Sequence, residues 1–86
     1  MDSLFNFETL TNRYLTIQER TNRLVSDLRR LIQLLEHDID YEEVRTGIAD
    51  IANSNYSVLA RQLRGRRDNL AATICKLEKE VDATYR

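Results

Sequence analysis

The stretch FETLTNRYLTIQERTNRLVSDLRRLIQLL, residues 7–35, places apolar side chains in alternating steps of three and four residues. Eight of the nine positions in this row are apolar, and the ninth is a threonine. The row consists of Phe7, Leu10, Tyr14, Ile17, Thr21, Leu24, Leu28, Leu31 and Leu35. Such spacing is the heptad pattern of a coiled coil, whose apolar side packs along a neighbouring helix. We therefore expect an all-α protein with a first helix over about residues 3–37.

The row widens in its second half, because Val25, Ile32 and Leu34 add apolar surface on its two flanks. A two-helix coiled coil buries only one such row on each helix. We therefore expect residues 25–35 to contact more than one neighbouring helix.

The composition suits long helices around a thin apolar interior. The 86 residues include no proline and two glycines, and 31% of them are charged against 42% that are hydrophobic. A chain this short forms one domain with a small core. We therefore predict a single helical domain over residues 1–86 that gains stability from a partner or from self-association.

The periodic pattern stops in the acidic segment of residues 37–43. Asp40, followed three residues later by Glu43, matches an N-cap residue with its capping-box partner. We therefore predict a turn at residues 38–40 and a second helix over about residues 41–84. Helices joined by so short a turn lie antiparallel, so the expected fold is a long, coiled-coil-like helical hairpin.

The second half carries weaker helix signals, because Gly47, Gly65 and the segment 53–55 lower helix propensity. Apolar residues nevertheless recur every eleven positions, which favours one continuous helix. The seam residues expected on this helix are Ile48, Leu59, Leu63, Leu70, Ile74, Leu77 and Val81. The alternative is a break near residue 54, with Ser54 capping a third helix in a three-helix bundle.

The predicted helix lengths favour assembly. A second helix of about 44 residues would extend past the first by about ten, or ~15 Å, and leave Leu77 and Val81 without a neighbour. Residues 1–43 carry nine acids and five bases, whereas residues 44–86 carry five acids and eight bases, which favours antiparallel pairing within or between chains. We expect a homo-oligomeric helical bundle, or a hairpin that holds an amphipathic helix of another protein.

Arginines at positions 61, 64, 66 and 67 form the main local cluster of charge. Arg61, Arg64 and Arg67 are the candidate basic contact patch, since arginine binds phosphate and carboxylate groups through paired hydrogen bonds. The alternative function is therefore a small dimeric helical regulator that binds nucleic acid through this patch. The net charge of −1 and the pI of 5.8 argue against it, because nucleic-acid-binding domains are usually basic.

Residue types that carry catalysis or bind metals are scarce. One histidine, one cysteine and no glycine-rich phosphate loop predict no enzyme activity, no metal, no cofactor and no small-molecule substrate. The single Cys75 cannot form an internal disulfide, and no apolar run approaches the ~18 residues that cross a bilayer. These features predict a cytoplasmic protein that makes no membrane contact.

An apolar seam without catalytic residues predicts a non-enzymatic protein–protein interaction module. Its role would be that of an oligomeric scaffold, an adaptor or a small chaperone. Binding would bury apolar surface at about 25 cal/mol per Å², less the entropy cost of ordering the partners.

Overall fold

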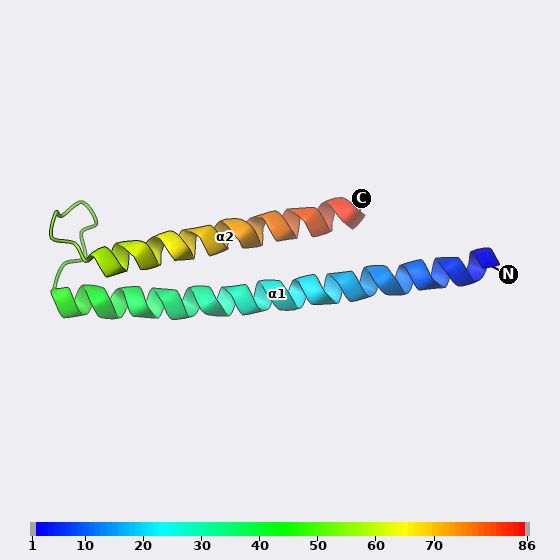
Figure 1. The fold of residues 1–86 in the computed structure, drawn as a ribbon, viewed down its shortest axis with the longest axis horizontal. Helices are drawn as coiled ribbons and strands as arrows, with labels where there is room; N and C mark the ends of the chain where they lie inside the picture. Colours follow the sequence, from blue (N-terminus) through cyan, green and yellow to red (C-terminus); the bar gives the residue numbers. More distant parts are fainter. Residues whose placement is uncertain (1, 86) are drawn as a thin grey trace.

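The computed structural model describes the backbone of residues 2–85 and the side chains of Arg13 and residues 15–81. In this part of the chain, two helices, α1 (Asp2–Thr46) and α2 (Val58–Tyr85), pack against each other as an antiparallel hairpin (Figure 1). The loop of residues 47–57 joins them at one end, and the hairpin is 69 Å long. The predicted all-α class is confirmed, whereas self-association into a bundle stays a prediction.

The turn predicted at residues 38–40 is wrong. α1 continues through these residues to Thr46, so Asp40 is an exposed residue within the helix. The helix ends just before Gly47, whose φ of 72° lies in the left-handed region that glycine adopts most easily. The Gly47 N–H donates to the carbonyl oxygen of Glu43 at 2.9 Å, which closes a left-handed helix cap. The acids of residues 36–43 therefore belong to the body of α1.

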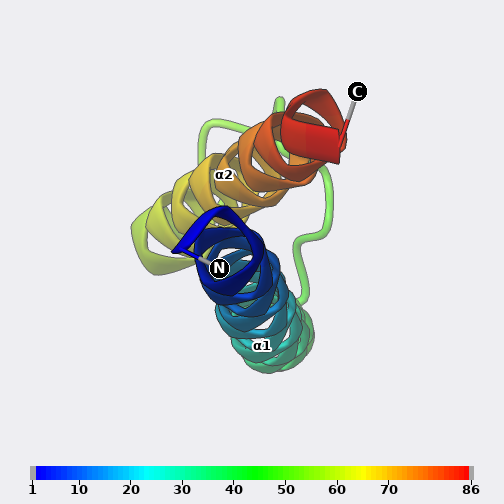
Figure 2. The ribbon, with the colours of Figure 1, turned by 90° about the vertical axis from the view of Figure 1, so that its right-hand side faces the viewer.

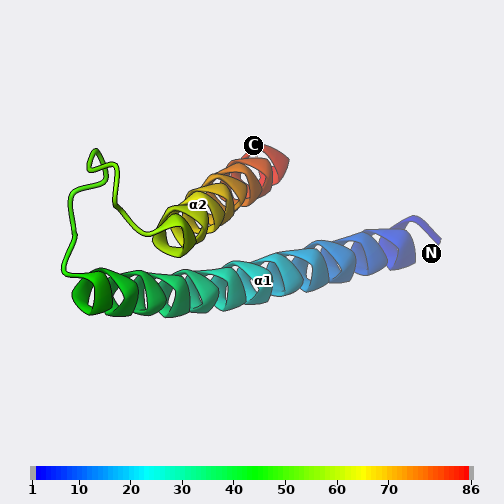
Figure 3. The same cartoon turned by 60° about the vertical axis from the view of Figure 1, so that its left-hand side comes forward.

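The continuous second helix predicted over residues 41–84 is also wrong, because residues 47–57 form a loop at the closed end of the hairpin (Figure 3). The carboxylate of Asp50 accepts a hydrogen bond from the N–H of Ala52 at 3.0 Å. The side-chain oxygen of Asn53 accepts one from the N–H of Asn55 at 2.8 Å. Short polar side chains that bind the backbone two residues ahead stabilise turns at the expense of helix.

α2 begins at Val58 because Ser57 caps it. The Oγ of Ser57 accepts a hydrogen bond from the N–H of Ala60 at 3.1 Å, which is the contact of an N-cap side chain with the third helical residue. Ser54, the cap expected for a third helix, is exposed in the loop. The three-helix alternative is wrong for residues 2–85, where one loop separates two helices. Seen end-on, α1 and α2 lie next to each other (Figure 2).

The two helices meet along a heptad seam. On each of them, buried or half-buried positions recur in steps of three and four residues. The seam positions are Gln18, Thr21, Val25, Leu28, Ile32, Leu35, Ile39, Glu42 and Thr46 on α1, and Ala60, Leu63, Arg67, Leu70, Ile74, Leu77 and Val81 on α2. The core is thin, as the composition predicted, and its least exposed side chains are Ile39 at 2% and Ala60 at 0%.

The overhang runs opposite to the prediction. α1 has 45 residues and α2 has 28, so α1 is 17 residues longer and its N-terminal end projects past the C-terminal end of α2 (Figure 1). Leu77 and Val81, expected to lie beyond the first helix, are half-buried in the seam. The reversal follows from the position of the loop, since moving the connection from residues 38–40 to residues 47–57 lengthens α1 and shortens α2.

Candidate interaction surface

A second heptad row runs along α1 beside the seam, and we call it the α1 stripe. Its eight positions follow the same steps of three and four, and all eight are exposed. The α1 stripe consists of Ile17, Arg20, Leu24, Asp27, Leu31, Leu34, Asp38 and Tyr41. Its five apolar side chains are 47–67% exposed, so the contact with α2 leaves much of each one in water.

The α1 stripe and the seam divide the predicted row between them. Thr21, Leu28 and Leu35 lie in the seam, whereas Ile17, Leu24 and Leu31 lie in the exposed stripe. Val25 and Ile32 complete the seam in place of Leu24 and Leu31, which directly precede them in the chain. The widened segment of residues 25–35 therefore carries two apolar faces, of which α2 covers one.

The other predicted seam residues fall into three groups. On α2, five of them lie in the seam, namely Leu63, Leu70, Ile74, Leu77 and Val81. Leu59 is exposed on α2 and Ile48 is half-buried in the loop. The predicted positions Phe7, Leu10 and Tyr14 lie outside the described side chains.

A group of polar contacts, which we call the closed-end cluster, holds the loop against both helices at the closed end of the hairpin. It consists of Glu42, Glu43, Arg45, Tyr56, Ser57, Arg61 and Arg64. Arg64 donates a hydrogen bond to the hydroxyl of Tyr56 at 2.7 Å and forms an ion pair with Glu43 of α1 at 3.0 Å. The hydroxyl of Tyr56 donates in turn to the Glu43 carboxylate at 3.4 Å, and the tyrosine is only 3% exposed. The hydrogen bonds from Arg64 to Tyr56 and then to Glu43 raise the pKa of Arg64 above its ordinary value.

Arg61 completes the packing around Tyr56. Its guanidinium carbon lies 5.5 Å from the centre of the Tyr56 ring, and that of Arg64 lies 5.8 Å from it. Both distances fall in the range of cation–π attraction. Arg61 also donates to the carbonyl oxygen of Ile51 at 3.0 Å, so both arginines hold the loop in place.

Glu42 is the one buried charged residue among the described side chains, at 6% exposure. Its carboxylate accepts hydrogen bonds from Arg45, one turn later in α1, and from the Oγ of Ser57 at 2.9 Å. These bonds, first that of Arg45 and then that of Ser57, lower the pKa of Glu42 below its ordinary value of 4.5. Ser57 therefore links the end of α1 to the start of α2, because the same oxygen caps α2.

The candidate basic contact patch is divided in the structure. Arg61 and Arg64 come together on the ring of Tyr56, whereas Arg67 lies half-buried in the seam and pairs with Asp68 at 3.1 Å. Arg66, the fourth arginine of the cluster, is exposed. The four arginines that cluster in the sequence thus lie in three different local environments and do not form one basic face.

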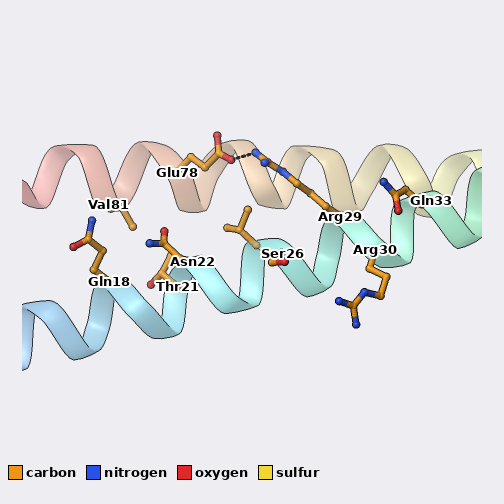
Figure 4. Close-up of a pocket in the computed structure, with 10 residues that line it drawn as sticks. Gln18, Thr21, Asn22, Ser26, Arg29, Arg30, Gln33, Glu78 and Val81 are labelled. Atoms are coloured by element: carbon orange, nitrogen blue, oxygen red, sulfur yellow. Dashed lines mark hydrogen bonds and ion pairs between the residues drawn. The ribbon is translucent and has the colours of Figure 1, made fainter.

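An open groove of about 720 Å³ lies between the helices where they diverge (Figure 4). Its α1 wall combines residues of the seam with a third row and contains no residue of the α1 stripe. The seam residues are Gln18, Thr21 and Val25, and the third row includes Asn22, Ser26, Arg29 and Gln33. An ion pair between Arg29 and Glu78 bridges the two helices at this groove (Figure 4). The lining is mostly polar and contains neither histidine nor cysteine, so it offers none of the usual nucleophile and base pairs.

Features of other classes of site are missing from the described residues. The residues that the structure describes include no group of three or more His, Cys, Asp or Glu side chains placed to hold a metal ion. Within residues 2–85, neither helix combines the length and the hydropathy that a bilayer-crossing helix needs. Cys75 is exposed on α2 as a free thiol.

Sequence reasoning missed the closed-end cluster and the split between stripe and seam. Tyr56 and Ser57 are far from Glu42 and Glu43 in the sequence, and only the loop brings them together. A usable signal was present in Gly47 followed by Asp50, Asn53 and Ser57, which is a helix stop, two turn residues and a helix start.

Comparison of the chain with protein-family models, with curated proteins and with solved structures finds no match.

Proposed function

We propose that this chain is a non-enzymatic helical-hairpin interaction module that binds an amphipathic helix along the α1 stripe. The observation that supports the proposal is the exposure of a complete heptad row on a helix whose other heptad row already packs against α2. Exposed apolar side chains that recur along one face of a small protein often mark an interaction site, and here five of them lie in one row that three charged residues interrupt. Scaffold, adaptor and small-chaperone roles all use such a face.

The length of the stripe suits a helical partner. From Ile17 to Tyr41 it spans 24 residue steps, or about 36 Å of helix at ~1.5 Å per residue. That is more than three heptads, which is the length at which a/d packing becomes a sustained coiled coil. Binding removes the five apolar side chains from water, and the free energy gained has to exceed the entropy cost of ordering the partner helix.

Folding and binding would use different faces of α1. The seam holds α2, whereas the stripe lies beside it. Substitutions on the stripe should therefore weaken binding while leaving the hairpin folded. The proposed partner is not nucleic acid, because Tyr56, Glu43 and the loop backbone already bind the guanidinium groups of Arg61 and Arg64. The cytoplasmic location stays a prediction.

A pair of matched variants tests the proposal. Leu24→Gln/Leu31→Gln alters the stripe, whereas Leu15→Gln/Val44→Gln makes the same change at two exposed apolar residues of α1 outside it. The readouts are molar mass by light scattering on the purified chain, its assembly size in extract of the cells that produce it, and helicity by circular dichroism.

We expect the wild-type chain and the Leu15/Val44 control to occur in an assembly, and the Leu24/Leu31 variant to lose it while remaining helical. A wild-type chain that is monomeric both when purified and in extract would overturn the proposal. So would a Leu24/Leu31 variant that assembles like the wild type.

A further inference from the structure

The α1 stripe is complementary to itself when it is reversed. When two copies of the stripe are placed antiparallel and centred on Arg29, the N-terminal half of one copy meets the C-terminal half of the other. Ile17 then lies opposite Tyr41, and Leu24 lies opposite Leu34. Because the steps alternate between three and four, each layer pairs an a position of one helix with a d position of the other. This is the pairing found in antiparallel coiled coils. Four of the eight layers in such a pair are therefore apolar on both sides.

The charges of the stripe fit the same register. Arg20 and Asp38, both exposed on α1, lie opposite each other in the reversed pair, and the two-fold symmetry creates this contact twice. In a parallel pair each position meets its own copy, so Arg20 would face Arg20 and Asp38 would face Asp38. Like charges in contact disfavour that arrangement, whereas opposite charges favour the antiparallel one.

The remaining two layers place Asp27 opposite Leu31, next to the two-fold axis. These layers weaken the contact, because burying a carboxylate against an apolar side chain costs free energy. Both ends of the stripe remain apolar, since Ile17 and Tyr41 close it on either side. The mismatch limits affinity without changing the register, because no other antiparallel alignment pairs Arg20 with Asp38.

The hairpin leaves room for such a contact. The stripe adjoins the seam on α1 without sharing a residue with it, so α2 keeps its place when α1 meets a second α1. A two-fold axis perpendicular to the helices puts both α2 helices on the same side of the α1 pair. The product is a four-helix arrangement of two hairpins, in which each helix still has an antiparallel neighbour.

We propose that the occupant of the α1 stripe is a second copy of this chain, packed antiparallel about an axis near Arg29 so that Arg20 of each copy pairs with Asp38 of the other. This inference rests on the proposed function and names its partner. The complementary charges of Arg20 and Asp38 and the four layers that are apolar on both sides carry it.

A charge-swap cycle tests the register. Arg20→Asp puts two acids opposite each other at both ends of the contact, Asp38→Arg puts two arginines there, and the double variant restores opposite charges. The dissociation constant of the dimer is measured for all four chains by sedimentation equilibrium at low ionic strength. Circular dichroism at low concentration checks that each hairpin remains helical.

Each single variant should weaken the dimer by about tenfold or more, and the double variant should return to within about threefold of the wild type. Equal dissociation constants for all four chains, or a double variant as weak as the singles, would overturn the register. A purified wild-type chain that stays monomeric at every concentration would overturn the second copy as occupant. In that case an assembly in extract that the Leu24/Leu31 variant loses would leave the proposed function standing.

Discussion

Arg64 of α2 reaches the carboxylate of Glu43 of α1 at 3.0 Å across the closed end of the hairpin. Its side chain is 24% exposed and that of Glu43 is 12% exposed, so water screens the pair only in part. The pair forms where the loop leaves α1 and returns to α2. It therefore fixes how the two helices are joined as well as how they pack.

A double-mutant cycle measures this pair. Glu43→Gln and Arg64→Gln should each destabilise the hairpin, and their effects should be less than additive, with a coupling of about 1 kcal/mol. The reason is that each single change removes the same contact and leaves the remaining charged side chain partly buried without its oppositely charged partner. Urea denaturation of the four chains gives the coupling, and strictly additive effects would mean that the pair contributes nothing.

The two glycines should respond to alanine in opposite directions. Gly47→Ala should destabilise the protein by about 1 kcal/mol, because φ of 72° is unfavourable for any residue with a Cβ. Gly65→Ala should stabilise it by about 0.5–1 kcal/mol, because Gly65 lies inside α2 and a Cβ there meets nothing within 4 Å. Thermal melting should separate the two variants by about 6–15 °C for a domain of this size. A Gly47→Ala variant as stable as the wild type would contradict the helix end at Thr46.

The start of α2 can be tested at two serines. Ser57→Ala should cost about 1 kcal/mol, because it removes the N-cap contact with Ala60. Ser54→Ala, at an exposed loop position, should change the stability by less than about 0.5 kcal/mol. Chemical denaturation compares them, and a larger effect at Ser54 would place the helix start where the three-helix alternative placed it.

Glu42 should make the hairpin sensitive to acid. Its pKa in the folded state lies below the ordinary value of 4.5, because Arg45 and Ser57 donate hydrogen bonds to the ionised carboxylate. The folded state therefore binds this proton less readily than the unfolded state does, so its stabilising effect is present above pH 4.5 and is lost as the pH falls through the lower folded pKa.

Glu42→Gln should accordingly be less stable than the wild type at neutral pH, and the gap should narrow as the pH falls below 4.5. Urea denaturation across this pH range measures the gap. Glu36→Gln removes an exposed carboxylate from the same helix and controls for net charge. A gap between Glu42→Gln and the wild type that stays constant with pH would show that the carboxylate is not held in its ionised form.

One substitution should strengthen the dimer. Asp27→Leu converts the two imperfect layers beside the axis into Leu–Leu contacts, so the dissociation constant should fall by about tenfold or more. Asp40→Leu makes the same change at an exposed position of α1 outside the stripe and should leave the constant near that of the wild type. Light scattering across a concentration series compares them, and an equal effect of the two changes would point to unspecific association.

The sequence predicted the helical class because it follows from heptad spacing. It predicted the antiparallel pairing because two helices joined by a short connection lie antiparallel, and this holds although the connection lies at residues 47–57. It misplaced the turn because Asp40 and Glu43 match a capping box equally well inside a helix, and because the partners of Glu43 lie in the loop and on α2. The helix stop at Gly47 was visible but was outweighed by apolar residues recurring every eleven positions across residues 47–57. That recurrence does not require one helix, since two separate helices with heptad seams produce it as well.

The division of α1 into seam and stripe could not be read from spacing. Leu24 and Val25, like Leu31 and Ile32, are adjacent apolar residues, and either member of each pair continues a row of threes and fours. The choice depends on the rotation of α1 about its axis, which the position of α2 and the closed-end cluster determine. The predicted row therefore combined residues of the two faces.

Cross-linking between chains tests most directly whether α1 packs antiparallel against a second α1. In a Cys75→Ser background, a Leu24→Cys chain is mixed with a Leu34→Cys chain and treated with a short thiol-reactive cross-linker. We expect covalent dimers in the mixture and almost none from either chain alone, because residue 24 of one copy faces residue 34 of the other. Dimers formed by the Leu24→Cys chain with itself, or no dimers in the mixture, would contradict it.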